Sequence, residues 1–249
     1  MTPYEMALAG YAALCVATVV PLLFVTAPYG RHARSGWGPA IPEKLGWVVM
    51  ESPAVLFFAY VFSQGANASQ TVPLVLFGMW QLHYIRRTFI YPFSIRSKGK
   101  TMPLLIAGLA FVYNFFNAYI NAHWIGHLGD YPTEWLYGAT FWIGLCVFAA
   151  GMVVNIHSDA VLRGLRAPGE TGYKIPYGGM YRWISAPNYF GELVQWFGWA
   201  IMTWSLGGLA FAVYTAANLA PRAIAHHRWY RETFDDYPSE RRALLPYLW

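Results

Sequence analysis

Charged residues are scarce in this sequence, and their scarcity excludes most classes of soluble protein. Asp, Glu, Lys and Arg make up 12% of the 249 residues and hydrophobic residues make up 57%, whereas soluble globular chains carry about 25% charged residues. The mean hydropathy of +0.32 therefore predicts a polytopic membrane protein with the lipid bilayer as its main partner. The pI of about 9.2 is explained by basic cytoplasmic loops, so we expect no nucleic-acid partner.

Cysteine is nearly absent, and several ligand-binding motifs are missing. Cys15 and Cys146 each lie inside an apolar run, which excludes a disulfide framework and a cysteine metal site. The histidines have no acidic or cysteine neighbours at ligand spacing, so we expect no metal. The chain also has no dinucleotide glycine fingerprint and no P-loop. Any nucleotide must therefore be held by membrane helices and loops.

Long uncharged runs are what the sequence has instead. A membrane-spanning helix needs about 20 mostly apolar residues, and seven segments meet or approach that length. In chain order they are Met6–Pro28, a segment from about Leu45, a segment from about Val72, Met102–Ile125, Leu136–Ile156, and two segments after Pro187 that are separated by a hairpin at Ser205–Gly208. We predict an all-α fold with seven transmembrane helices and no soluble second domain.

The basic residues are distributed unevenly among the connections between these segments. All 17 Lys and Arg residues fall on one side, because Gln64–Thr71 and the turns around Asp130 and Gly207 contain none. Since cytoplasmic loops collect Lys and Arg, this pattern predicts an N-terminus outside and a cytosolic C-terminus. Within one membrane domain, we expect residues 1–128 to form a lipophilic pocket and residues 129–249 to bind a cofactor.

Glu51 and Tyr84 are polar side chains inside two neighbouring predicted helices. A charged residue in a membrane helix costs roughly 2.5–3.5 kcal/mol on insertion scales, so such residues are functional candidates. The two helices are antiparallel and joined by a short turn, so both side chains fall in the cytosolic half at one depth. They either pack structurally or donate hydrogen bonds to a carbonyl. Pro53 follows Glu51 and can loosen the local backbone.

The fourth predicted helix carries Asn114, Asn117 and Asn121. Asn117 and Asn121 are four residues apart and share a face. We interpret these amides as hydrogen bonds between helices rather than as ligand contacts.

The stretch from Asn155 to Gly179 ends the fifth predicted helix and becomes basic and rich in Gly and Pro. Arginine and free backbone amides bind phosphates, while Asn and Asp suit ribose or carboxamide groups. The positive charges alone would also satisfy the topology rule without a ligand. In the tail, Arg222, His226 and Tyr230 are spaced by four and share a helix face, which is either solvated or closes over a nucleotide.

The C-terminal hundred residues resemble the steroid 5α-reductase family. The strings that carry this resemblance are Asn155–Asp159, Leu162–Glu170, Ile175-Pro176 with Gly178-Gly179, Asn188 with Gly191-Glu192, and Asp235–Pro238; upstream they are Trp47, Glu51–Pro53, His83-Tyr84 and Arg87–Phe89. The resemblance implies a seven-helix membrane enzyme that transfers hydride from NADPH to the β-carbon of a 3-oxo-4-ene steroid.

The resemblance also implies residue roles. Glu51 and Tyr84 would bind the ketone, and Trp47 and Tyr113 would line the steroid pocket. The residues that would hold NADPH are Asn155, Asp159, Arg163, Arg166, Tyr173, Lys174, Asn188, Glu192, Arg222, His226 and Tyr230. Met50 stands where mammalian members often carry Gln, which leaves the steroid preference open. We expect a monomer, in the inner membrane of a bacterium or the endoplasmic reticulum of a eukaryote.

The chemistry of an enone suits this pair of residues. Hydride addition places negative charge on the carbonyl oxygen, so donors aimed at that oxygen lower the barrier. Tyr84 is such a donor, and we expect Glu51 to be protonated, because burial disfavours a carboxylate. Three alternatives stay open: a reductase of the same superfamily with a polyprenyl or long-chain enoyl substrate, a membrane methyltransferase, and a non-catalytic sterol-binding protein.

Overall fold

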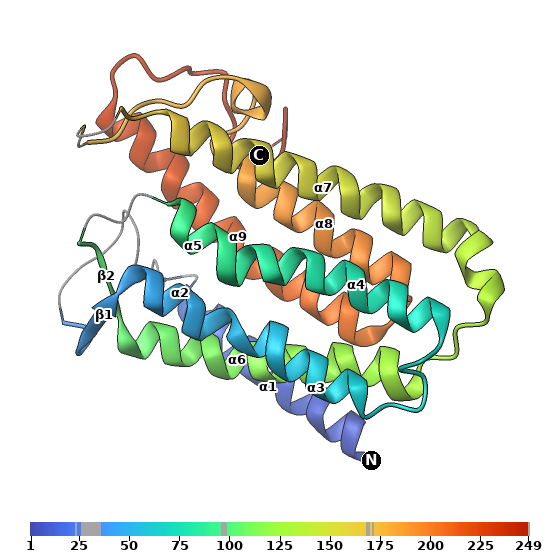
Figure 1. Ribbon diagram of the computed structural model, residues 1–249. Helices are drawn as coiled ribbons and strands as arrows, with labels where there is room; N and C mark the ends of the chain where they lie inside the picture. Colours follow the sequence, from blue (N-terminus) through green and yellow to red (C-terminus); the bar gives the residue numbers. More distant parts are fainter. Residues whose placement is uncertain (23, 26–35, 96–98, 168–169, 171, 249) are drawn as a thin grey trace.

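The computed structural model describes all residues except 23, 26–35, 96–98, 168–169, 171 and 249, and its long helices form roughly parallel rods (Figure 1). The predicted end of the first helix at Pro28, and two residues of the string Leu162–Glu170, lie outside the described residues. The helices are α1 (Pro3–Leu22), α2 (Glu43–Ser52), η2 (Pro53–Phe57), α3 (Phe58–Ser63), α4 (Thr71–Ile85), η3 (Arg86–Ile90), α5 (Tyr91–Ser94), α6 (Leu104–His123), η4 (Trp124–Leu128), η5 (Thr133–Tyr137), α7 (Ala139–Gly164), η6 (Gly179–Arg182), α8 (Pro187–Thr203) and α9 (Leu206–Thr233).

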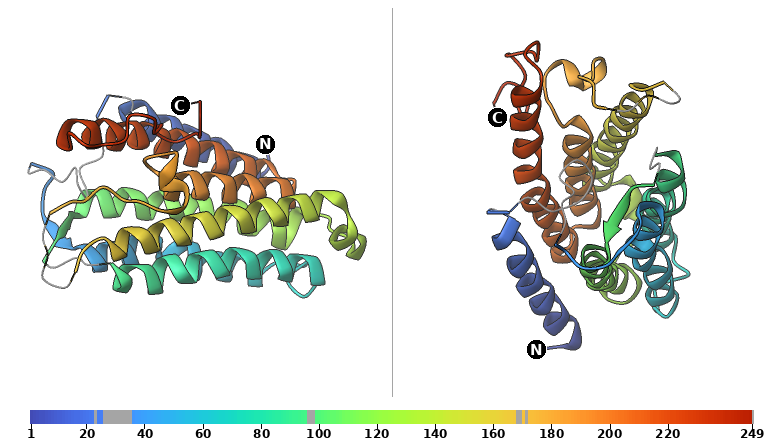
Figure 2. Two further views of the ribbon diagram at one scale, coloured as in Figure 1. Left: turned by 90° about the horizontal axis from the view of Figure 1, so that it is seen from above. Right: turned by 90° about the vertical axis from the view of Figure 1, so that its left-hand side faces the viewer.

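Two short strands close one end of the bundle. β1 (Ala40–Pro42) pairs antiparallel with β2 (Thr101–Pro103). Because α2 follows β1 directly and α6 follows β2 directly, this pairing brings the first turns of α2 and α6 together. The right-hand view of Figure 2 shows α1 at one edge of the bundle, where it contacts α6 and α9.

Four helical segments among the described residues are long and apolar enough to cross a membrane. They are Pro3–Leu22, Glu43–Ser63, Leu104–Leu128 and Ala139–Gly164. Large apolar side chains such as Leu56, Ile143 and Val153 are exposed on helix surfaces, where acyl chains would surround them. A helical fold with several apolar segments of membrane-spanning length is therefore confirmed, while seven spans and their orientation stay predictions.

Helix α7 differs from the predicted fifth helix. We expected Leu136–Ile156, but α7 begins at Ala139 and continues to Gly164. Hydropathy falls after Ile156, yet the stretch that follows contains no proline, and its only glycine is Gly164, so nothing in it breaks a helix. Asp159 and Arg163 consequently lie on a rigid helix rather than in a loop.

Three of the helical rods contain a π-helical turn. In η2 the turn begins at Pro53, whose missing N–H removes one helical hydrogen bond, and the Phe58 amide bonds back to the Pro53 carbonyl. The turn η3 begins directly after α4 and contains both Arg86 and Arg87. Adjacent side chains leave any helix in directions roughly a quarter turn apart, so these two arginines reach different neighbours.

Glycines set the close packing of α7 on α8. A Cβ added at Gly151 would overlap the backbone of Gly191 and Gln195, and one added at Gly198 would overlap the backbone of Phe148. Small residues at a helix interface allow backbones to approach closely, as is common in membranes. This seam brings the polar end of α7 next to the first turns of α8.

Replacing Gly151 with alanine should force α7 and α8 apart. We expect a loss of stability of roughly 1–3 kcal/mol from overpacking, measured as a lower midpoint of thermal unfolding in detergent. Gly108 on α6 is a matched control, because a Cβ there meets nothing within 4 Å and alanine is the better helix former. Equal midpoints for Gly151→Ala and Gly108→Ala would contradict the packing described.

Candidate active site

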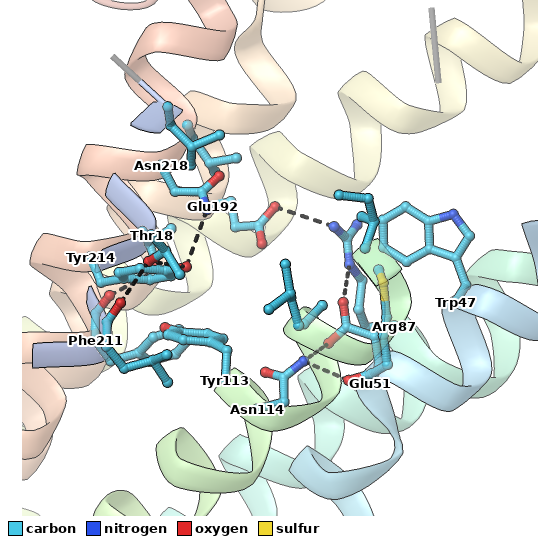
Figure 3. Close-up of a pocket in the computed structure, with 18 of the residues that line it drawn as sticks. Thr18, Trp47, Glu51, Arg87, Tyr113, Asn114, Glu192, Phe211, Tyr214 and Asn218 are labelled. Atoms are coloured by element: carbon cyan, nitrogen blue, oxygen red, sulfur yellow. Dashed lines mark hydrogen bonds and ion pairs between the residues drawn. The ribbon is translucent and has the colours of Figure 1, made fainter. Parts of the chain in front are cut away.

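A cavity of about 470 Å³ lies between α1, α2, α4, α6, α8 and α9 (Figure 3). That volume is within the usual range of about 300–1,000 Å³ for small-molecule sites. Most of its wall is apolar, with residues such as Leu14, Ile106, Leu109 and Phe211. The cavity therefore suits a lipophilic molecule, and its few polar groups fix how that molecule is oriented.

Glu51 is one of two carboxyl residues in the wall of this cavity, and Glu192 is the other. Its Oε2 accepts a hydrogen bond of 3.1 Å from Asn114 Nδ2, and its Oε1 lies 3.7 Å from Arg87 Nε. Asn114 also donates to the Met50 carbonyl oxygen at 2.8 Å. Asn114 thus joins α6 to α2, as we interpreted it, but it also points the Glu51 carboxyl into the cavity, which the sequence did not indicate.

Arg87 lines the cavity, and sequence reasoning assigned it no role in the site. Its Nη2 lies 3.8 Å from Glu192 Oε2, so one guanidinium contacts a carboxylate on α2 and a carboxylate on α8. The guanidinium carbon also lies 4.7 Å from the Trp47 ring centroid and 4.9 Å from that of Tyr91. We interpreted this arginine as a topology charge and as part of the string Arg87–Phe89 that resembles the family, because two adjacent arginines near a helix end are typical of a cytosolic boundary.

Tyr84 lies in the wall of the same cavity as Glu51, as their expected depths require. Its ring is 4.7 Å from the Trp80 ring and 5.6 Å from the Trp196 ring, which fixes the direction of the phenol. Within the described part of the chain, no hydrogen bond joins the Glu51 and Tyr84 side chains. Tyr113 also lines the cavity, on the α6 side.

Three of the residues expected to hold a cofactor form a polar cluster with Arg86, namely Asn155, Asp159 and Asn188. Arg86 Nη1 donates to Asn155 Oδ1 at 3.3 Å, and Arg86 Nη2 lies 3.6 Å from Asp159 Oδ2. Asn155 Nδ2 donates to the Asn188 carbonyl at 3.0 Å, while Asn188 Nδ2 donates to Asp159 Oδ1 at 3.4 Å. Glu192 follows one turn after Asn188 and connects this cluster to the cavity.

Three of the other expected cofactor residues lie on α9, where Arg222 and His226 have a different setting from Tyr230. Arg222 Nε donates to the Tyr189 hydroxyl at 2.9 Å, and the His226 ring lies 5.4 Å from that of Tyr189, so both face α8. Tyr230 shares their helix face but is only 2% exposed and stacks on Tyr237 at 5.2 Å, which places it inside the packing of the tail.

The basic loop after α7 lies at the surface. Tyr173 and Lys174 are exposed, and Lys174 Nζ pairs with Glu170 Oε2 at 2.7 Å. The Arg166 guanidinium lies 5.9 Å from the Tyr173 ring centroid, and Arg163 is half-buried on the last turn of α7. None of these four basic or aromatic side chains lines the cavity.

Ser185 anchors the C-terminal tail and was not indicated by the sequence. Its Oγ lies 2.6 Å from both His227 Nδ1 and the Tyr237 hydroxyl, and its backbone N–H donates to the Arg242 carbonyl at 2.8 Å. Burial raises the pKa of Tyr237, so the phenol keeps its proton and remains a hydrogen-bond donor. These bonds fasten the tail against the start of α8, next to Asn188.

The polar cluster has the donors and acceptors that a nicotinamide nucleotide requires. Asp159 Oδ2 is buried and lies 3.6 Å from Arg86 Nη2, but it accepts no hydrogen bond from the described residues, so a ribose hydroxyl or a carboxamide N–H would satisfy it. Arg163 and Arg166, one to two turns farther on, suit phosphate oxygens. The residues present therefore fit a dinucleotide that enters from the polar end of α7.

Comparison with known proteins identifies the family. A family model described as 3-oxo-5-alpha-steroid 4-dehydrogenase matches residues 100–249. The chain is 42% identical over 241 residues to steroid 5-alpha-reductase DET2 of Gossypium hirsutum, which covers 95% of this chain and 93% of that protein. It is 43% identical over 241 residues to 3-oxo-5-alpha-steroid 4-dehydrogenase 1 of Bos taurus, again with 95% and 93% covered. For the Homo sapiens protein of that name, identity is 40% over 222 residues, with 88% and 84% covered. The resemblance found in the sequence is confirmed, and the chain belongs to the 3-oxo-5-alpha-steroid 4-dehydrogenase family of oxidoreductases.

Proposed function

We propose that this protein reduces the 4,5 double bond of a 3-oxo-4-ene steroid to the 5α-dihydro product, with NADPH as the cofactor. The observation that carries the proposal is the contact of Arg87 with both Glu51, in the wall of the lipophilic cavity, and Glu192, next to the polar cluster. An apolar site and a polar site suited to a nucleotide thus meet at Arg87. The names of the relatives support the same activity.

The proposed role of each residue follows from its position. Glu51 and Tyr84 hold the ketone, and Trp47 and Tyr113 contact the steroid skeleton. The cofactor residues are Asn155, Asp159, Arg163, Arg166, Tyr173, Lys174, Asn188, Glu192, Arg222, His226 and Tyr230. Tyr230 acts through packing, since it is buried in the tail. Residues 1–128 supply most of the cavity wall, and residues 129–249 supply the cofactor site.

NADPH supplies the hydride when bound. The hydride adds to the β-carbon of the enone, and the electron pair of the double bond shifts to form a double bond between the α-carbon and the carbonyl carbon. The π pair of the carbonyl moves to its oxygen, which gives an enolate. Tyr84 and Glu51 donate hydrogen bonds to that oxygen and so stabilise the charge as it develops. A proton from water or from the Tyr84 hydroxyl then adds at the α-carbon and completes the saturated ketone. The apolar wall excludes water, which strengthens these hydrogen bonds.

One proton makes the Glu51, Arg87 and Glu192 group neutral. With both carboxyls ionised the group carries one net negative charge, which is costly in a largely buried site and would repel the enolate. We place the proton on Glu51, which leaves Arg87 to pair with Glu192. Asn114 then donates to one Glu51 oxygen, and the carboxylic acid O–H points to the ketone.

We also propose seven membrane spans with the N-terminus outside and the C-terminus cytosolic, because all Lys and Arg residues fall on one side. The protein acts as a monomer in the inner membrane of a bacterium or the endoplasmic reticulum of a eukaryote. Labelling of Ser69→Cys by an impermeant maleimide from the cytosolic side only would contradict this orientation.

The activity is tested by incubating purified protein and NADPH with a 3-oxo-4-ene steroid, an enoyl thioester and a polyprenal. We expect NADPH oxidation and a 5α-dihydro product with the steroid, because the cavity is lined by apolar groups and has, at one side, groups that can donate hydrogen bonds to a carbonyl oxygen. A saturated thioester or polyprenal as the main product would favour a reductase of another lipid. Binding of S-adenosylmethionine in preference to NADPH would favour a methyltransferase. No turnover of any of the substrates would favour a non-catalytic sterol-binding protein.

The variants Glu51→Gln and Glu51→Ala distinguish a neutral Glu51, which donates a hydrogen bond to the ketone, from an anionic Glu51. Because glutamine keeps an N–H donor, we expect Glu51→Gln to retain turnover within about tenfold of the wild type. We expect Glu51→Ala to lose roughly 100- to 1,000-fold in kcat, the usual cost of one such donor. Single-turnover reduction of the steroid measures this step directly. Equal losses in the two variants would show that Glu51 acts as a carboxylate.

A further inference from the structure

A second polar group lies across the cavity from Glu51. Thr18 on α1 and Tyr214 on α9 are joined by a 3.2 Å hydrogen bond between their hydroxyl oxygens, and Asn218 Nδ2 donates to the Tyr214 hydroxyl at 3.4 Å. All three residues line the cavity. Figure 3 shows them on the opposite side of it from Glu51 and Arg87, with Tyr113 in between.

The role of Asn218 is not explained by helix packing. The bond between Thr18 and Tyr214 already joins α1 to α9, and the Tyr214 ring stacks on Tyr113 of α6 at 4.1 Å. Asn218 is four residues after Tyr214 on the same helix, so its hydrogen bond joins no second element. Within the described residues, the Asn218 carboxamide oxygen accepts no hydrogen bond, which leaves an acceptor and a second N–H at the cavity.

These polar groups restrict which chemical groups of a bound molecule can lie against this otherwise apolar wall. A hydrocarbon placed against Asn218 would displace water and leave its carboxamide unsatisfied, which is unfavourable. A hydroxyl or carbonyl oxygen at that position would accept from Asn218 Nδ2, and a hydroxyl would also donate to Asn218 Oδ1. Sites built to hydrogen-bond a substrate oxygen reject analogues that lack it far more strongly than apolar pockets reject an extra methylene.

We propose that Asn218, supported by Tyr214, selects steroids that carry a hydroxyl or carbonyl oxygen at the end opposite the 3-ketone, in preference to steroids with a hydrocarbon there. This inference rests on the proposed function, because it takes Glu51 and Tyr84 as the binding site of the ketone. It assigns the two polar sides of the cavity to the two ends of one elongated substrate.

The test compares two substrates in three proteins. The substrates are 17β-hydroxyandrost-4-en-3-one and androst-4-en-3-one, which differ only in the terminal oxygen. We expect the wild type to prefer the hydroxylated steroid by roughly ten- to hundredfold in kcat/KM. In Asn218→Leu, which keeps the volume and removes both polar atoms, that ratio should fall to within about threefold of unity.

Thr215→Val is the matched control. Thr215 is on the same helix and lines the same cavity, but its hydroxyl already donates to the Phe211 carbonyl at 2.9 Å. Its substrate ratio should equal that of the wild type. If Asn218→Leu is unstable in detergent, Tyr214→Phe removes only the supporting hydroxyl and should lower the ratio in the same direction.

Three results would overturn the inference. The wild type could turn over both steroids equally, or Asn218→Leu could lower kcat/KM for both by the same factor. Asn218→Leu could also raise KM for NADPH and leave the substrate ratio unchanged, which would assign Asn218 to the cofactor. Failure of the wild type to reduce either steroid is a different outcome, because it would contradict the proposed function and the inference with it.

Discussion

A single guanidinium holds the two halves of this site together. Arg87 contacts Glu51 on α2 at 3.7 Å and Glu192 on α8 at 3.8 Å, and the Trp47 and Tyr91 rings cover it. A carboxylate without a partner inside a membrane protein is expensive, so Glu192, which keeps its charge when Glu51 is protonated, depends on this one cation. Removing either partner of such a group leaves a charge uncompensated. The lipophilic cavity and the polar cluster are therefore coupled by electrostatics as well as by their proximity.

The elements packed around Arg87 explain how one side chain contacts both Glu51 and Glu192. Within η3, Arg86 contacts Asn155 and Asp159 on α7, while the next residue, Arg87, lines the cavity and contacts Glu51. The glycine seam between α7 and α8 brings the first turns of α8, with Glu192, close enough to meet it. On the opposite wall, α1 and α9 supply the polar group around Asn218. The cavity thus has a polar group on each side and apolar walls between them.

Much of this arrangement could be predicted from the sequence, and the parts that could not have identifiable causes. Glu51 stands out because an acidic residue inside an apolar run is rare, and the starts of the long helices follow from hydropathy. The role of Arg87 was hidden, because two arginines near a helix end also satisfy the topology rule. The extension of α7 to Gly164 was missed since hydropathy marks where a span ends and not where a helix ends. Asn218 gave no signal, because one amide in a late helix matches no motif and depends on α1 and α6 for its setting.

The central claim is that Arg87 couples the steroid site to the cofactor site. Equilibrium binding of a 3-oxo-4-ene steroid, measured with and without saturating NADP⁺, tests it in the wild type, in Arg87→Gln and in Arg182→Gln, where Arg182 is an exposed arginine outside the cavity. The account predicts that NADP⁺ tightens steroid binding roughly tenfold in the wild type and in Arg182→Gln, a typical coupling between two sites, and has almost no effect in Arg87→Gln. An undiminished effect of NADP⁺ in Arg87→Gln would contradict it.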